Sequence, residues 1–477
     1  MKTRVLAGSL TATGLALGIG QFSATALPGG SDGGLPSNGP DVIVGDIPDI
    51  ARYAPGTYLG KTFAAYAVGT TSCNIGNQQL QWQPNPSNLH PTIPQNMYRV
   101  KNGAIEQIGM SWCKHGFCAL QQNICGTCTP AGGGCPTVLG IGCSDPYTAS
   151  LNGAQNDLKS RGPINPSTGW FSGTYTDPTA PSGMPASIRE RLAVDRNDLD
   201  PALNPGAAYF VEGQYVHIQD SESNNATNNA SYRRVNVGTN WSATQGYSLT
   251  MSGATVRMMP AIYGWQAIHS DVVIVPVDAT RDGRFNVGYR TWPNTDGTWH
   301  YEYAIHNLNS DRAGGSFKVP VPAGVTVTNI GFKAPMYMNG EPYTNVPWTA
   351  RVENGFIIWT CEPNTNPNAN ALRWSTTYNF RFDANAAPVN RTAAIGLWKA
   401  PPSGVTEVEL AVAVKGPDGP TQPPCPPGDF NCDQQINGDD LGYFLSKWGT
   451  EGGDTDFNGD GYTDGIDLGQ FLGYWTF

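Results

Sequence analysis

The sequence contains little charge, since only 14% of its 477 residues are Asp, Glu, Lys or Arg. Helical bundles and coiled coils are rich in Ala, Glu, Lys, Leu and Arg, so these classes are excluded. Basic residues are the scarcer kind, with 28 Lys and Arg against 38 Asp and Glu and a formal net charge of −10. This balance argues against nonspecific binding of nucleic acid, which depends on basic side chains that neutralise phosphates.

Long apolar runs are scarce as well. Beyond the first 26 residues no run of 18 or more apolar residues occurs, so the sequence predicts no transmembrane segment. By contrast, 58 Gly and 38 Pro supply many turns, and 13 Trp, 20 Tyr and 16 Phe supply large apolar side chains for a core. Full disorder is thereby excluded, and the composition favours a mostly β, secreted protein.

The N-terminus has the pattern of a secretory signal peptide, which we predict over residues 1–26. Lys2 and Arg4 form its basic end, Val5–Ile19 is apolar, and Ala24-Thr25-Ala26 supplies small residues for cleavage. Residues 27–40 are rich in Gly, Pro and Ser and are predicted to be a linker. We therefore expect a secreted, extracellular protein.

Export affects how the ten cysteines are interpreted, because oxidising compartments favour disulfides over zinc. The spacing Cys113-x4-Cys118-x6-Cys125-x2-Cys128 could otherwise be taken for a zinc ribbon. Seven cysteines lie between residues 73 and 143, so one of them must be free or must pair with Cys361. The pairing itself stays open. The disulfide candidates are Cys73, Cys113, Cys118, Cys125, Cys128, Cys135, Cys143, Cys361, Cys425 and Cys432.

Short β-rich runs between polar turns predict two domains in the body of the chain. We place a β-rich domain at 41–290, with a disulfide-rich insertion at 109–145, and a β-sandwich domain at 291–415. Within the sandwich, residues 299–306 alternate strictly and put Trp299, Tyr301, Tyr303 and Ile305 on one face. Residues 187–194 are predicted to form a short helix.

Several polar groups in the body invite a functional hypothesis. His300, Glu302 and His306 share one strand face, but at about 3.3 Å per residue His306 lies about 20 Å from His300, so the three cannot bind one ion. The oxygen-rich segment Asp195–Asp200 fits either a structural calcium site or a solvated turn. A glycosidase needs two carboxylates on a sugar-binding cleft. The sequence offers no way to choose them among Glu190, Glu212, Glu302, Glu341 and Glu353.

The C-terminal segment 425–477 follows a Pro-rich linker at 416–424 and repeats itself with an offset of 27 residues. It holds ten acidic residues and one basic residue, a net charge of −9. Each copy puts oxygen side chains at loop positions 1, 3, 5, 9 and 12, the spacing of an EF-hand calcium loop whose position 7 offers a backbone carbonyl. The predicted ligands of two calcium ions are Asp429, Asn431, Asp433, Gln435, Asn437 and Asp440, and Asp456, Asn458, Asp460, Tyr462, Asp464 and Asp467.

A helix is predicted after each loop, because apolar residues recur at i, i+3, i+4 and i+7. The two apolar faces can pack against each other. One face consists of Leu441, Phe444, Leu445 and Trp448, and the other of Leu468, Phe471, Leu472 and Trp475.

The duplicated loop and helix resemble a dockerin module over residues 425–477. The resemblance implies a calcium-binding module that attaches the protein to a cohesin-like or other surface receptor. The implied partner-binding residues are Leu441, Phe444, Leu445, Leu468, Phe471 and Leu472. Gln434 stands where such loops have Gly, so we expect the second loop, which has Gly461, to bind calcium more tightly. Cys425 and Cys432 flank the first loop, as in a dockerin subtype with its own disulfide.

These observations predict a secreted, β-rich binding or structural protein that the dockerin-like tail attaches to a cell surface or scaffold. The alternative is a polysaccharide-active enzyme, such as a glycoside hydrolase, carried by the same tail. A deep cleft with two facing carboxylates would favour the enzyme, whereas flat aromatic faces would favour binding.

Overall fold

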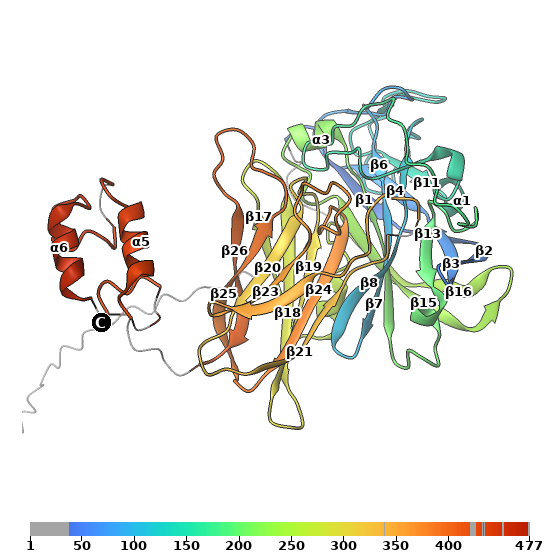
Figure 1. Ribbon diagram of the computed structural model, residues 1–477. Helices are drawn as coiled ribbons and strands as arrows, with labels where there is room; N and C mark the ends of the chain where they lie inside the picture. The colour runs from blue at the N-terminus through green and yellow to red at the C-terminus, as the bar shows by residue number, and fades with distance from the viewer. Residues whose placement is uncertain are drawn as a thin grey trace, which may run out of the picture. The chain divides into compact units, whose positions relative to one another are not determined.

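The computed structural model describes residues 38–337, 339–419, 426–431, 433, 435–450 and 453–475 (Figure 1). The predicted signal peptide, most of both linkers, and the pair Cys425 and Cys432 lie outside the described residues. Strands dominate the described chain, which confirms the mostly β fold class.

The first half of the body is built around an antiparallel sheet of eight strands. Its apolar face packs into a core that includes Tyr66, Trp82, Met97 and Tyr215. In sheet order the strands are β16 (Gly246–Val256), β15 (Ala230–Ser242), β14 (Ala208–Gln214), β7 (Gln95–Lys101), β8 (Ala104–Met110), β13 (Leu192–Asp195), β3 (Lys61–Val68) and β2 (Ile50–Tyr58).

Smaller elements surround this sheet. Three short sheets are formed by β1 (Val42–Asp46), β4 (Thr70–Asn74) and β11 (Ser144–Tyr147); by β5 (Leu80–Gln81) and β10 (Val138–Leu139); and by β6 (Thr92–Ile93), β9 (Cys113–His115) and β12 (Leu158–Lys159). The short helices are α1 (Ala149–Asn152), a 3₁₀ turn (Gln155–Asp157), α2 (Arg196–Leu199), α3 (Ile218–Glu222) and α4 (Tyr263–Ile268).

Disulfides hold the insertion at 109–145, as predicted. They join Cys73 to Cys125, Cys118 to Cys135 and Cys128 to Cys143. Cys113 and Cys361 are free thiols, so the odd cysteine of the block does not pair with Cys361. Cys113 lies in β9 and is fully buried.

The second half of the body is a β-sandwich, as predicted. Its two antiparallel sheets face each other across an aromatic core in which Phe317 contacts Tyr303 and Phe380 at ring-centroid distances of 5.4 and 5.0 Å. In order, one sheet contains β17 (Val273–Asp278), β18 (Arg284–Pro293), β19 (Trp299–Asn307), β24 (Thr376–Ala384) and β21 (Val327–Lys333). The other contains β22 (Thr349–Glu353), β23 (Phe356–Thr360), β20 (Gly314–Pro320), β25 (Pro388–Leu397) and β26 (Glu409–Pro417).

The boundaries of the sandwich differ from the predicted ones at both ends. Its strands β17 and β18 begin before residue 291, and β26 continues through Pro417, two residues into the segment predicted as a linker. The alternation in β19 is confirmed, because Tyr301, Tyr303 and Ile305 join the core.

The short helix predicted at 187–194 is wrong. Residues 192–195 form β13 instead, which pairs with β3 on one side and β8 on the other. The strand is buried in the middle of the sheet, and pairing on both sides outweighs the weak local preference for a helix.

The tail folds into the two predicted helices, α5 (Gly438–Ser446) and α6 (Gly465–Gly473). Each begins three residues before the first residue of the apolar pattern, because Asn437 and Asp464 cap them in capping boxes with Asp440 and Asp467. Among the described residues, no helix is long and apolar enough to cross a membrane.

The disulfide pattern predicts which thiols react. Alkylation in denaturant without reductant should label Cys113 and Cys361 and leave the six paired cysteines unlabelled. Peptide mass spectrometry reads the labels, and a sample reduced first is the control, in which all ten cysteines of the chain should react. Labelled Cys118 or Cys135, or bound zinc, would contradict the assignment.

Candidate functional site

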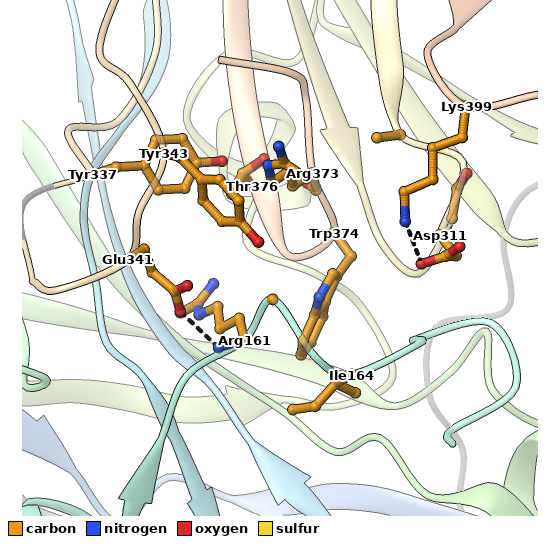
Figure 2. A pocket seen from close by; sticks show the side chains of 13 residues that line it. Arg161, Ile164, Asp311, Tyr337, Glu341, Tyr343, Arg373, Trp374, Thr376 and Lys399 are labelled. Carbon is orange, nitrogen blue, oxygen red and sulfur yellow. Dashed lines mark hydrogen bonds and ion pairs between the residues drawn. The ribbon is translucent and has the colours of Figure 1, made fainter. Parts of the chain in front are cut away.

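A cleft lies between the segment after β12 and four loops of the sandwich, which follow β19, β21, β23 and β25. Counted out into open solvent, the space in the outer region of the cleft is about 980 Å³ and that in the inner region about 420 Å³. Figure 2 shows the inner region, with Arg161 and Ile164 from the first half of the body and the other labelled residues from the sandwich. The residues common to both regions are Gly162, Glu341, Tyr343, Arg373 and Lys399.

Glu341 is the buried acid of this cleft, with 5% of its surface exposed. Its Oε1 accepts a hydrogen bond of 2.6 Å from the backbone N–H of Arg161, whereas its Oε2 is buried and has no hydrogen-bond partner. Burial raises the pKa of Glu341 to about 7, although the hydrogen bond and the charges of Arg161 and Arg373 work in the opposite direction. Near neutral pH the carboxyl group can therefore both give and take a proton.

Arg161 holds Glu341 in place and is itself almost fully buried. Its guanidinium donates to the carbonyls of Ser111 at 2.6 Å, Gln95 at 3.0 Å and Ser375 at 3.2 Å, and to Oδ1 of Asn96 at 3.0 Å. These four acceptors are neutral oxygens from both halves of the body. Arg161 therefore acts as a positioning residue at the base of the cleft.

Arg373 lies on the aromatic wall of the cleft. Its guanidinium carbon is 3.6 Å from the ring centroid of Tyr343 and 4.8 Å from that of Trp398, both within cation–π range. One terminal nitrogen donates to the carbonyl of Pro367 at 2.7 Å, while Nε is buried without a hydrogen-bond partner. At the opposite side, Lys399 and Asp311 form an ion pair of 2.8 Å (Figure 2).

The other candidate carboxylates have different surroundings. Glu212 is buried and accepts hydrogen bonds from Asn96 and from the backbone of Ala261. Glu190 pairs with Arg189, and Glu353 is exposed. Of the five candidates, only Glu341 lines this cleft.

His300 and Glu302 belong to a separate network of charges. Nδ1 of His300 is 2.6 Å from Asp383 and its Nε2 is 3.4 Å from Glu302. Burial lowers the pKa of His300, but hydrogen bonds to the two carboxylates raise it above its ordinary value overall. His306 instead contacts Thr377, so the expected separation from His300 is confirmed.

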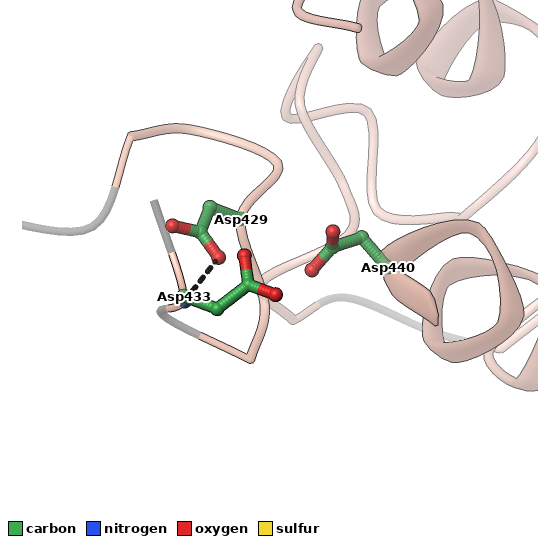
Figure 3. Close-up of side chains that lie close together, drawn as sticks. All are labelled: Asp429, Asp433 and Asp440. Atoms are coloured by element: carbon green, nitrogen blue, oxygen red, sulfur yellow. Dashed lines mark hydrogen bonds between the residues drawn. The ribbon is translucent and has the colours of Figure 1, made fainter. Parts of the chain in front are cut away.

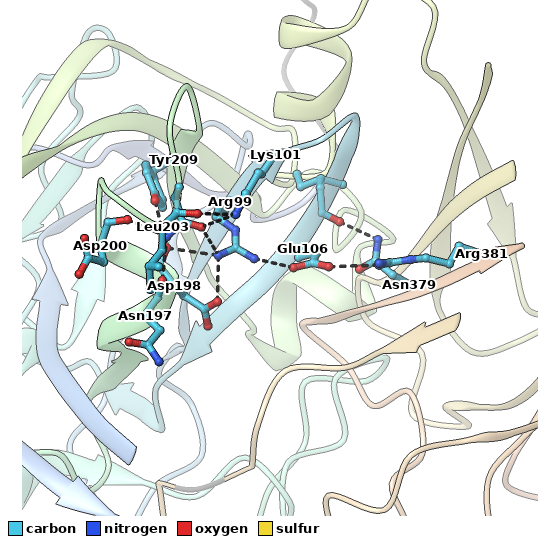
Figure 4. A network of polar contacts seen from close by, with 12 residues as sticks. Arg99, Lys101, Glu106, Asn197, Asp198, Asp200, Leu203, Tyr209, Asn379 and Arg381 are labelled. Carbon is cyan, nitrogen blue, oxygen red and sulfur yellow. Dashed lines mark hydrogen bonds and ion pairs between the residues drawn. The ribbon is translucent and has the colours of Figure 1, made fainter. Parts of the chain in front are cut away.

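Arg381, which binds Glu302 at 3.1 Å, also belongs to a second network that ties the two halves of the body together (Figure 4). Arg381 of β24 binds Glu106 of β8 at 3.1 Å, and Glu106 binds Arg99 of β7 at 2.8 Å. Arg99 also binds Asp198 at 2.9 Å. Arg99 thus neutralises Asp198 within the acidic segment Asp195–Asp200, and we assign this network a structural role.

In the tail, the first loop brings three carboxylates together (Figure 3). Oxygens of Asp429, Asp433 and Asp440, at loop positions 1, 5 and 12, lie within 4.8 Å of one another. These are hard oxygen donors of the kind that calcium prefers.

The last acid of each loop organises the backbone around it. Asp440 accepts hydrogen bonds from the backbone N–H groups of Phe430, Asn431 and Asn437. Asp467 accepts from Phe457, Asn458 and Asp464, the residues 27 positions later. Desolvation works against the charged form of Asp467, but these N–H groups lower its pKa below the ordinary value.

The apolar residues of the tail fall into two groups. Phe444 and Phe471 are fully buried and contact each other at 5.3 Å between ring centroids, so they form the core of the tail. This corrects the prediction that they bind a partner. Leu441 and Leu468 pack against that core, whereas Leu445 and Leu472 are each 50% exposed.

Comparisons with known proteins assign no family. No family model and no curated protein matches the chain. Two solved structures, of an exo-β-D-glucosaminidase CsxA and of the Amycolatopsis orientalis exo-chitosanase CsxA, are similar at 10% and 9% identity, each with a TM-score of 0.15. The similarity covers 73% and 74% of this chain and 25% of each of theirs. A TM-score of 0.15 is too low to indicate a shared fold.

The sequence identified the loops of the tail but missed most of the cleft. Glu341 was one of five equivalent candidates, and Arg161, Tyr343, Arg373 and Lys399 were not singled out. No local motif marks them, because the hydrogen bond between Arg161 and Glu341 spans 180 residues of sequence.

The buried acid predicts a pH effect on stability. The pKa of Glu341 is about 7 in the folded protein and 4.5 in the unfolded chain. The side chain therefore contributes its full stabilisation of the fold below pH 4.5, and this contribution is lost as the pH rises through about 7. The substitution Glu341→Gln removes the titration. Relative to wild type, the variant should gain roughly 3 kcal/mol in free energy of unfolding between pH 4.5 and pH 8.

Urea unfolding at pH 4.5, 6 and 8 measures this difference. The control is Glu353→Gln, which removes an exposed carboxylate of the same sandwich and should show no such trend. A Glu341→Gln difference that stays constant with pH would mean that the carboxyl group titrates normally.

Proposed function

We propose that this chain is a secreted binding protein attached to a cell surface or scaffold by a calcium-dependent, dockerin-like tail. The observation that carries the proposal is the repetition in the tail. Each loop ends in a buried aspartate that accepts the same three backbone hydrogen bonds and caps the helix that follows. Two matching loops of this kind favour the interpretation that the tail holds two calcium sites over the interpretation that it is merely acidic and solvated.

Calcium fits the chemistry of the loops. Side-chain oxygens at positions 1, 3, 5, 9 and 12, with the backbone carbonyls of Gln435 and Tyr462 at position 7, would hold one ion each. Two ions add four positive charges to a segment of −9 and so reduce the repulsion among its carboxylates. In the second loop Gly461 has a φ of +98°, a conformation that only glycine adopts without strain.

The tail also offers an apolar surface for docking. Besides Leu445 and Leu472, several large apolar residues are exposed on a unit of about 50 residues, which is unusual for a surface without a partner. They are Tyr443, Trp448, Tyr462, Ile466 and Tyr474. A protein receptor of the cohesin type is the partner that this surface supports.

For the body, binding is better supported than catalysis. Hydrolysis of a glycoside needs a second free carboxylate opposite Glu341. The other acid of the cleft, Asp311, is held by Lys399 in an ion pair. The polysaccharide-active enzyme therefore stays the second candidate.

Calcium titration of the full chain tests the tail. Isothermal calorimetry should detect two sites, the tighter one in the second loop, so Asp467→Ala should weaken binding more than Asp440→Ala. Asp439→Ala is the matched control, because this exposed acid lies next to Asp440 at a position that offers no ligand. The absence of binding at millimolar calcium would refute the module, and equal losses in the two loops would refute the predicted order.

Retention on the producing cells tests docking. The double variant Leu445→Glu/Leu472→Glu should appear in the medium, as wild type should after calcium is chelated, because charged side chains are costly in an apolar interface. Leu59→Glu changes an exposed leucine of the body and should leave retention unchanged. If the double variant is retained like wild type, this surface is not the docking site.

A further inference from the structure

The inner end of the cleft presents two hydrogen-bonding groups without partners. Oε2 of Glu341 is a buried acceptor, and Nε of Arg373 is a buried donor. Buried polar groups are nearly always hydrogen-bonded, since an unsatisfied group loses its interaction with water and gains nothing in return. Both residues line the inner and outer regions of the same cleft, so a bound molecule could satisfy both.

The space beside these groups is kept open by Gly162. A Cβ at this position would lie 2.4 Å from the hydroxyl of Tyr343 and 3.8 Å from Oε2 of Glu341. Any larger residue would therefore displace Tyr343 and fill the volume in front of the free carboxylate oxygen. The glycine leaves room for a ligand group at the atom that lacks a partner.

The charges of the cleft oppose a cation beside the arginines and an anion beside Glu341. Arg161 and Arg373 would repel an ammonium group, whereas Glu341 would repel a carboxylate or phosphate once it is ionised. Lys399 and Asp311 neutralise each other at 2.8 Å. A neutral group that donates to Glu341 and accepts from Arg373 meets neither repulsion, and a hydroxyl does both.

The outer region of the cleft suits a chain of such groups. It is open, and it is lined by aromatic, proline and amide side chains, which supply flat apolar contacts together with neutral hydrogen-bonding groups. These are Pro163, Pro178, Pro342, Trp398, Asn364 and Asn368.

We propose that this cleft binds a neutral saccharide chain, with a sugar hydroxyl that donates to Oε2 of Glu341 and accepts from Nε–H of Arg373. The following sugars lie along Trp398 and Asn368 in the outer region. The inference rests on the proposal that the body binds a ligand, and it is independent of calcium binding by the tail.

Affinity gel electrophoresis of the full chain tests this site. The probes are five neutral polysaccharides, namely hydroxyethyl cellulose, arabinoxylan, galactomannan, laminarin and soluble starch, with polygalacturonate and chitosan as charged comparisons. At least one neutral probe should retard the wild type.

Glu341→Gln places an amide N–H₂ where the acceptor stood and should raise the dissociation constant at least tenfold. Asn368→Ala, an exposed change that leaves the core intact, should raise it about threefold.

Two control variants show whether the effect belongs to this cleft. Glu353→Gln should bind like wild type, and Asp467→Ala, which affects the tail alone, should also bind like wild type whether or not calcium binding is lost. Release of reducing ends that Glu341→Gln abolishes would support the saccharide and add hydrolysis. Binding of the charged polymers alone, no binding of any neutral probe, or equal binding by wild type, Glu341→Gln and Asn368→Ala would overturn the proposal.

Discussion

The body depends on one buried positive charge, the guanidinium of Arg161. A charge out of water is tolerated only when hydrogen bonds replace its hydration, and here the carbonyls of Gln95, Ser111 and Ser375 do so. Because Gln95 and Ser111 belong to the first half of the body and Ser375 to the sandwich, this residue fixes one half against the other. Its backbone N–H also orients Glu341, so the same residue positions the buried acid of the cleft.

Around Arg161 the two halves meet through polar contacts as well as through an apolar cluster, in which Trp374 of the sandwich packs with Ile164 and Phe171. Asn379 of β24 donates to the carbonyl of Ile105 in β8 at 2.7 Å, and Gln107 accepts from the backbone of Thr377 at 2.7 Å. Directional bonds of this kind specify a single arrangement more strictly than apolar packing does. Because residues of both halves line the cleft, an interface with one fixed arrangement also fixes the geometry of the cleft.

The sequence predicted what local patterns encode. Alternation in β19 and the 27-residue repeat of the tail each arise from neighbours along the chain, and both helices and the face of β19 were found. Residues 192–195 could not be assigned in this way, because strands far away in sequence determine their structure. The cleft was hidden for the same reason, since Arg161 and Glu341 meet only after both halves have folded.

The free thiol of Cys113 lies five residues before Cys118, which takes part in a disulfide. Thiol–disulfide exchange needs an accessible thiolate, and burial in β9 raises the pKa of the Cys113 thiol far above its ordinary value. In the folded chain the Cys113 thiol, the free thiol closest in sequence to these cysteines, is thus kept from attacking the three disulfides of the insertion. The short three-stranded sheet of β6, β9 and β12, by burying Cys113, therefore protects the disulfides of the insertion against exchange within the folded chain.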